Sequence, residues 1–148
     1  LNSPIAFCAG RGEKIRPLKE PYYFSALVVL PDINVSTQKV YKNYDHNPQL
    51  YETLHNKISS FLEKNRVDLA AKMCANMLQN SCFKVQQNLS KLKASIESLG
   101  CKPLCLSGSG SAMFYPAGPD DKIQLNRLQQ DIETRTGCRC VIVRNNRW

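Results

Sequence analysis

The run from Tyr23 to Leu30 constrains the fold more than any other part of the sequence. It reads Tyr-Phe-Ser-Ala-Leu-Val-Val-Leu and ends at Pro31, which has no N–H to donate to a sheet. β-Branched and aromatic residues favour extended backbone. Because the second half of the run is apolar at consecutive positions, both faces of this strand need cover. The sequence therefore predicts a buried, central strand.

The remaining segments alternate between extended and helical patterns. Extended segments are predicted at 4–18 (a hairpin turning at Gly10 and Gly12), 103–106, 112–115 and 138–144. Apolar residues recur at helical spacing over 49–64, 69–78, 85–99 and 119–137, and Gly100 and Gly137 end the last two of these helices. A short helix capped by Ser36 or Thr37 is expected to carry Lys39 and Tyr41 outward. This order predicts an α+β fold, an antiparallel sheet covered by helices on one side.

A Gly/Ser run, Ser107-Gly108-Ser109-Gly110-Ser111, lies between two of the predicted strands. Such a segment lets the backbone approach a ligand and present several N–H groups to an anion. It is not a Walker loop, because no Gly-Lys-Ser/Thr follows, and Met113 stands where a dinucleotide motif would have its third glycine. The same composition is typical of a tight turn between strands, so the run alone leaves both interpretations open.

The net charge of +8 favours anionic partners. The basic residues are scattered and no aromatic residues interleave them, so phosphate-rich small molecules rank above nucleic acid as ligands. No apolar run is long enough to cross a membrane and no leader peptide is evident, so we expect a cytoplasmic protein of a bacterium, with a plastid location as the alternative. A basic, non-enzymatic RNA-binding domain is the alternative.

Seven cysteines are present. The spacings of Cys101 and Cys105, and of Cys138 and Cys140, suggest a structural metal site, but neither pair is Cys-x-x-Cys and both flank predicted strands. Strand alternation alone places Cys138 and Cys140 on one face. We therefore expect no metal and buried free thiols in a reducing compartment.

Several segments, taken in order, occur together in one family. They are Gly10-Arg11-Gly12-Glu13, Val35-Ser36-Thr37 with Val40-Tyr41, Asn80 with the run 92–99, and Leu106-Ser107-Gly108-Ser109-Gly110-Ser111-Ala112-Met113-Phe114. In this combination the chain resembles the GHMP small-molecule kinases over nearly its whole length. The resemblance implies that 21–148 forms a C-terminal domain of the GHMP-kinase type, and that 1–20 ends an N-terminal, ATP-binding domain.

The resemblance also implies a chemistry. Gly-Arg-Gly-Glu and Val-Ser-Thr narrow it to the subfamily that uses ATP and Mg²⁺ to phosphorylate the 2-hydroxyl of a cytidine-diphosphate-linked polyol in non-mevalonate isoprenoid synthesis. Tyr41 matches the residue that stacks on cytosine, and Thr37 matches the substrate-side turn. The family's loop near the nucleotide phosphates is matched by Ser107, Gly108, Ser109, Gly110 and Ser111. Lys39 and Lys42 are further candidates by charge, or else solvated surface lysines.

The sequence also departs from the family pattern. It contains neither the N-terminal lysine, nor the Gly-Leu-Gly-x-Gly-Ser-Ser loop for ATP, nor the aspartate that acts as catalytic base. We therefore expect no catalytic residue in this chain, no phosphorylation by the chain alone, and a requirement for the missing N-terminal half. Another GHMP kinase, acting on homoserine, mevalonate or a sugar, is the second alternative.

Overall fold

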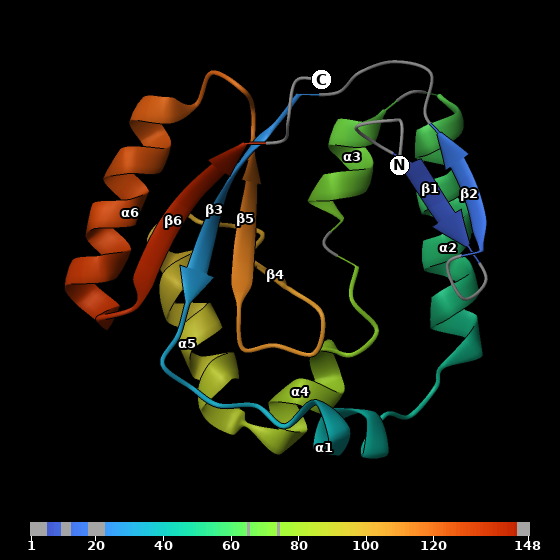
Figure 1. Ribbon diagram of the computed structural model, residues 1–148, viewed down its shortest axis with the longest axis horizontal. Helices are drawn as coiled ribbons and strands as arrows, with labels where there is room; N and C mark the ends of the chain where they lie inside the picture. Colours follow the sequence, from blue (N-terminus) through green and yellow to red (C-terminus); the bar gives the residue numbers. More distant parts are fainter. Residues whose placement is uncertain (1–5, 10–12, 18–22, 65, 74, 145–148) are drawn as a thin grey trace.

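The computed structural model describes residues 6–9, 13–17, 23–64, 66–73 and 75–144, and these form an α+β fold (Figure 1). The main sheet is antiparallel with the strand order β4-β5-β3-β6. Its strands are β3 (Ser25–Leu30), β4 (Cys105–Leu106), β5 (Met113–Ala117) and β6 (Arg139–Arg144). Strand β3 pairs with β5 on one side and β6 on the other, so the predicted central position is confirmed. The prediction that both of its faces are covered is correct only in part, because Val28 is half-buried and Leu30 is exposed.

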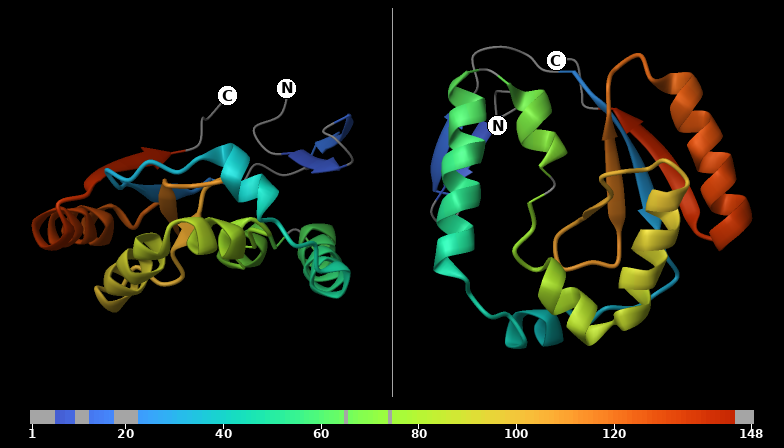
Figure 2. Two further views of the ribbon diagram at one scale, coloured as in Figure 1. Left: turned by 90° about the horizontal axis from the view of Figure 1, so that it is seen from below. Right: turned by 180° about the vertical axis from the view of Figure 1, so that it is seen from behind.

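Three helices cover one face of this sheet: α4 (Gln79–Val85), α5 (Gln87–Ser98) and α6 (Lys122–Thr136) (Figure 2). The core forms where their apolar faces meet the sheet. Leu27, Val29 and Met113 contribute from the strands, and Leu89, Ile96, Leu125 and Ile132 from the helices; all are buried. Burying each such side chain contributes about 1.5–3 kcal/mol, so this layer stabilises the sheet.

Helix α1 (Thr37–Lys42) packs against α4 at one end of this two-layer body, and α2 (Pro48–Glu63), α3 (Val67–Lys72), β1 (Ala6–Ala9) and β2 (Lys14–Pro17) lie to one side of it (Figure 1). Helix α1 follows β3, and α2 packs against α3. Strands β1 and β2 form the predicted hairpin. The rings of Phe7 and His55, 6.3 Å apart between centroids, join the hairpin to α2. The predicted turn at 10–12 lies outside the described residues, and the assignment of 1–20 to another domain stays a prediction.

Two predicted helix ends are confirmed by backbone conformation. Gly100 follows α5 with φ +101°, and Gly137 follows α6 with φ +69°. Side chains other than glycine rarely adopt this left-handed region. Each glycine therefore turns the chain from a helix toward the next strand.

The helix predicted over 69–78 is wrong in its second half. The structure has α3 ending at Lys72 and α4 beginning at Gln79, with non-helical backbone in the described residues between them. Asn76 explains the interruption, because its side chain donates to the carbonyls of Leu106 and Gly108 and accepts from the Leu78 N–H, an arrangement typical of a turn rather than of a helix. The helix predicted over 85–99 is confirmed as α5, which begins at Gln87; Val85 instead ends α4.

The cysteines follow the prediction in part. Cys82, Cys101, Cys138 and Cys140 are buried free thiols, and Cys8 is an exposed one. Cys105, however, is disulfide-bonded, which corrects the expectation of free thiols throughout. Among the described residues, no group of three or more His, Cys, Asp or Glu side chains is arranged to hold a metal ion.

Candidate functional site

The Gly/Ser run forms the tight turn that joins β4 to β5. The Ser107 N–H donates to the carbonyl of Ala112, and the Gly110 N–H donates to the carbonyl of Ser107, both at 2.9 Å. Gly108 and Gly110 have φ values of +55° and +88°, which favour glycine. The alternation of glycine with serine therefore places left-handed backbone at two positions of a five-residue turn.

The turn leaves three backbone donors free, whereas the carbonyls in its first half are occupied. In the part of the chain that the structure describes, the backbone N–H groups of Gly108, Ser109 and Ser111 have no hydrogen-bond acceptor. The carbonyls of Leu106, Ser107 and Gly108 are all hydrogen-bonded. Three unpaired N–H groups on consecutive or near-consecutive residues are what an anion requires of backbone.

Helix α1 places Thr37 against this turn. The Ser36 side chain caps the helix by accepting from the Lys39 N–H at 3.3 Å, so Thr37 is the first helical residue. The hydroxyl groups of Thr37 and Ser109 are 2.9 Å apart and hydrogen-bonded. The structure thus brings together the predicted substrate-side residue and the predicted phosphate-side turn.

Tyr41 lies one helical turn further along α1. Its side chain is 60% exposed, which leaves its ring open to solvent rather than packed in the core. Lys39 and Lys42 are also exposed. Val40, by contrast, is fully buried and anchors the helix to the core. Helix α1 is therefore held to the core by Val40 and exposes an aromatic ring and two lysine side chains to solvent.

Asn76 is the residue of this site that the sequence did not indicate. Its Nδ2 donates to the carbonyls of Leu106 and Gly108, both at 2.8 Å, and its Oδ1 accepts from the Leu78 N–H at 2.9 Å. The one available indication in the sequence was that an asparagine occurs in a segment whose apolar residues recur at helical spacing. That pattern does not reveal a partner thirty residues away.

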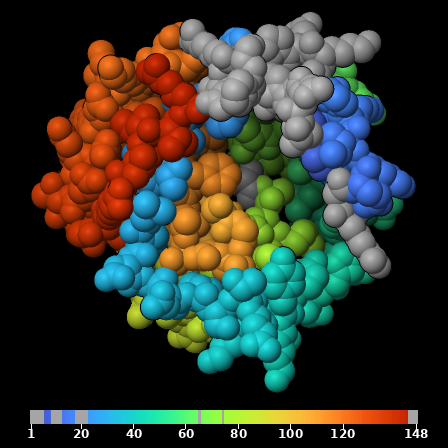
Figure 3. All heavy atoms as spheres, in the orientation of Figure 1, coloured from blue at the N-terminus to red at the C-terminus, as the bar shows by residue number. Residues whose placement is uncertain are grey.

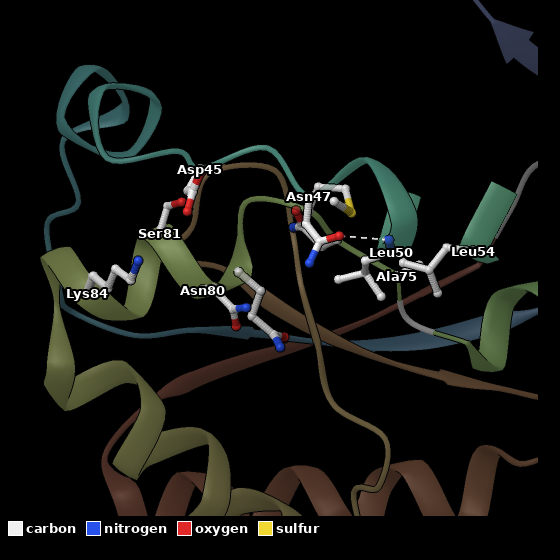
Figure 4. Close-up of a pocket in the computed structure, with 11 residues that line it drawn as sticks. Asp45, Asn47, Leu50, Leu54, Ala75, Asn80, Ser81 and Lys84 are labelled. Carbon is white, nitrogen blue, oxygen red and sulfur yellow. Dashed lines mark hydrogen bonds between the residues drawn. The ribbon is translucent and has the colours of Figure 1, made fainter. Parts of the chain in front are cut away.

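Two hollows lie beside Asn76. One, of about 420 Å³, has the polar side chains of Asp45, Ser81 and Lys84 toward one end and Leu50 and Leu54 at the other (Figure 4). The second, of about 290 Å³, separates the β4–β5 side of the sheet from α2 and α3 and is visible as a depression in Figure 3. Neither is lined by Thr37, Tyr41 or residues 107–111. The predicted site lies outside both hollows, with Thr37 and Tyr41 exposed and Ser109 half-buried.

The donor set of this surface fits phosphate better than a metal ion. It consists of backbone N–H groups, hydroxyls and two lysine ammonium groups. Mg²⁺ is bound in proteins mainly through carboxylates and substrate phosphates. Because the surface formed by Thr37, Tyr41 and residues 107–111 offers no carboxylate, we assign no Mg²⁺ ligand to these residues.

This fold and this turn belong to a known class. The sequence pattern of the family described as GHMP kinases C terminal matches residues 58–133, which is half of the chain. The chain therefore belongs to the GHMP kinase C-terminal family. The match includes the Gly/Ser turn, the Asn76 segment, α4, α5 and most of α6.

Within the class, two relatives with similar sequences carry the same enzyme name. The chain is 36% identical over 110 residues to the 4-diphosphocytidyl-2-C-methyl-D-erythritol kinase of Clostridium botulinum (strain Eklund 17B / Type B), covering 74% of this chain and 39% of that protein. It is 32% identical over 115 residues to the same kinase of Thermodesulfovibrio yellowstonii, covering 75% and 40%. The chain thus spans about two fifths of the length of these relatives.

Solved structures agree on the fold. A crystal structure of 4-(cytidine 5'-diphospho)-2C-methyl-D-erythritol kinase superposes with a TM-score of 0.61 at 22% identity, covering 97% of this chain and 50% of that one. Homoserine kinase from Cytophaga hutchinsonii gives a TM-score of 0.63 at 14% identity, covering 90% and 44%. At these identities the likeness shows the fold alone. In the described part of the chain, no helix has the length and apolar character needed to cross a membrane.

Proposed function

We propose that this chain is the substrate-side part of an ATP-dependent kinase that phosphorylates the 2-hydroxyl of 4-diphosphocytidyl-2-C-methyl-D-erythritol, a step of non-mevalonate isoprenoid synthesis in the cytoplasm. The observation that carries the proposal is the hydrogen bond between Thr37 and Ser109, 2.9 Å long. It joins a helix with an exposed aromatic ring to a turn with free N–H groups. A ligand with a planar base and a diphosphate needs these two features side by side.

Each part of the surface has a role in this proposal. The Tyr41 ring stacks on the cytosine, an interaction worth about 1–3 kcal/mol per base. Residues 107–111 and the ammonium groups of Lys39 and Lys42 neutralise phosphate charge. Phosphoryl transfer depends chiefly on such positioning and charge neutralisation. The chain can therefore be essential to the reaction without supplying the catalytic base.

In the proposed reaction the 2-hydroxyl oxygen forms a bond to the γ-phosphorus of ATP, and the bond from that phosphorus to the β–γ bridging oxygen breaks. ADP leaves, and the hydroxyl proton passes to a base supplied from outside this chain. ATP supplies the phosphoryl group, and Mg²⁺ neutralises its phosphates. The base and the main ATP loop belong to the rest of the kinase, as the 39% coverage of the Clostridium relative allows.

Cytidine diphosphate is the probe for the stacking role. We would titrate the ¹⁵N-labelled chain and its Tyr41→Ala and Tyr41→Phe variants, following the amides of α1. Tyr51→Ala is the matched control, because Tyr51 is a half-exposed tyrosine on α2. Saturable binding should persist in Tyr41→Phe and Tyr51→Ala and weaken about tenfold or more in Tyr41→Ala. Equal binding by all four proteins would contradict the stacking role.

A chimera tests the activity itself. The matching C-terminal part of the Clostridium botulinum kinase is replaced by this chain, and ATP-dependent phosphorylation of 4-diphosphocytidyl-2-C-methyl-D-erythritol is measured against homoserine. The chimera should phosphorylate the cytidine substrate, and the isolated chain should phosphorylate neither. Turnover by the isolated chain, or a chimera that prefers homoserine, would overturn the proposal. Salt-sensitive binding of RNA in place of cytidine diphosphate would favour a nucleic-acid-binding domain instead.

A further inference from the structure

The side chain of Asn76 uses all of its strong hydrogen-bonding groups inside the protein. Its two N–H donors go to two carbonyls, those of Leu106 and Gly108, which lie 30 and 32 residues away in the sequence. Its oxygen accepts from the Leu78 N–H, just before α4. The Asn76 amide group therefore connects the α3–α4 segment to Leu106, the last residue of β4, and to Gly108, the second residue of the Gly/Ser turn.

These bonds determine which backbone groups the turn leaves free. With the Leu106 and Gly108 carbonyls held by Asn76, and the Ser107 carbonyl held by the Gly110 N–H, the acceptors at the start of the turn are occupied. The N–H groups of Gly108, Ser109 and Ser111 have no acceptor among the described residues. A carbonyl rotated toward a phosphate would repel it, whereas an N–H group would bind it.

We propose that Asn76 is a positioning residue, which holds the Leu106 and Gly108 carbonyls away from a phosphate group and so leaves the N–H groups of Gly108 and Ser109 to bind it. The inference rests on the proposed function, in which this turn lies near phosphates. Asn76 itself does not touch the ligand. It acts through the peptide groups of Leu106 and Gly108.

Two substitutions separate this role from a merely structural one. Asn76→Asp retains an oxygen that can accept from the Leu78 N–H but has no donor for the two carbonyls. Asn76→Leu removes the donors and the acceptor at similar size and without adding charge. Asn56→Asp and Asn56→Leu are the matched controls, because Asn56 is exposed in α2 and makes no side-chain hydrogen bond among the described residues.

The probe is inorganic pyrophosphate, which carries phosphate groups but no base. It is titrated into the full ¹⁵N-labelled chain and each variant, and the amide shifts of Gly108, Ser109 and Gly110 are followed. We expect saturable shifts in the unsubstituted chain and in both Asn56 variants, and about tenfold weaker binding in both Asn76 variants. Asn76→Asp should keep the amide spectrum of α4, since it keeps the bond to Leu78.

Each other outcome overturns the inference. If pyrophosphate shifts no turn amide in the unsubstituted chain, or shifts only amides near scattered lysines, the turn is not a phosphate site. If the Asn76 variants bind as tightly as the controls, Asn76 does not set the turn. Failure of the proposed function looks different, because it appears as loss of discrimination between cytidine diphosphate and pyrophosphate, with the turn shifts intact.

Discussion

Gly110 lies so close to Cys82 that a Cβ atom at Gly110 would be 2.8 Å from the Cys82 sulfur and 3.2 Å from Cδ1 of Leu106. Cys82 is completely buried in α4, so the Gly/Ser turn rests directly on that helix. The backbone of Gly110 also has a φ of +88°. Space and conformation therefore both require glycine at this position.

Gly110→Ala is expected to destabilise the protein. Adopting positive φ costs a non-glycine residue about 1–2 kcal/mol, and forcing a methyl group into a packed site costs about 1–3 kcal/mol more. The control is Gly108→Ala, because Gly108 has a similar φ of +55° but a Cβ there has no neighbour within 4 Å. Urea denaturation should show the larger loss for Gly110→Ala.

A second variant isolates the contact with sulfur. Adding Cys82→Ala to Gly110→Ala removes the closest atom and should recover part of the lost stability, while the backbone strain remains. Two results together would show that packing of the turn on α4 does not cause the loss of stability. Gly108→Ala and Gly110→Ala would be equally destabilised, and adding Cys82→Ala to Gly110→Ala would recover no stability.

The sequence predicts those features that depend on neighbouring residues. Several confirmed predictions rest on such local patterns. They are the helical spacing of apolar residues in α2 and α6, the central position of β3, the Ser36 cap, and the glycines that follow α5 and α6. The break between α3 and α4 is not local, because it depends on an Asn76 side chain bonded to carbonyls 30 and 32 residues away. The disulfide at Cys105 was missed for a similar reason, since composition says nothing about which sulfurs meet.

The candidate site shows the same division. Composition identified the Gly/Ser turn, and the resemblance identified Thr37 and Tyr41, whose ligand contacts stay predictions. That Thr37 and Ser109 bond to each other follows only from the fold, which brings α1 beside the β4–β5 turn. Residue spacing along the chain carries no information on such a contact.

Stability should fall in alkaline solution because of buried thiols. Burial raises the pKa of Cys101 to about 11, and burial, with Glu133 and neighbouring thiols, raises that of Cys140 to about 12, from an ordinary 9.0. Below pH 9 these thiols are protonated in both the folded and the unfolded chain. Above it the unfolded chain ionises first, so each thiol removes up to about 1.4 kcal/mol of stability per pH unit until its folded pKa is reached.

Urea denaturation between pH 8 and pH 11 measures this loss. Cys140→Ala and Cys101→Ala should each show a shallower decline with pH than the unsubstituted chain. Cys8→Ala is the control, because Cys8 is a free thiol that is exposed rather than buried. Identical declines in all four proteins would show that other groups cause the loss.

Glu97 links the end of α5 to the start of β4, and its removal should change acid stability. Burial raises the pKa of its carboxyl, but the hydrogen bonds from Lys93 and the Leu104 N–H, with the charges of Lys93 and Lys102, outweigh burial and lower the pKa below 4.5. The carboxylate therefore stabilises the fold above pH 4.5, and this contribution is lost as the pH falls through the lowered pKa.

Glu97→Gln should cost about 1 kcal/mol at pH 7, because a charged acceptor is replaced by a neutral one. The difference from the unsubstituted chain should shrink below pH 4.5. Glu52→Gln is the control, since Glu52 is exposed on α2. A Glu97→Gln variant that is equally destabilised at pH 3 and pH 7 would show that the effect is not ionic.

The Thr37–Ser109 hydrogen bond should couple the two halves of the candidate site. Thr37→Val keeps the side-chain shape and removes the hydroxyl, and Ser109→Ala removes its partner. Because the bond is exposed, each variant should change the free energy of unfolding by less than about 1 kcal/mol. The effect on ligand should be larger, since the bond sets the position of α1 relative to the turn.

A double-mutant cycle on binding of cytidine diphosphate measures that coupling. If the hydroxyls act through each other, Thr37→Val and Ser109→Ala each weaken binding several-fold, and the double variant weakens it little further, giving a coupling energy of about 0.5–1 kcal/mol. Thr37→Ser, which retains the hydroxyl, should bind as the unsubstituted chain does. Additive losses would mean that Thr37 and Ser109 contact the ligand independently, and that the bond between them forms only when the surface is empty.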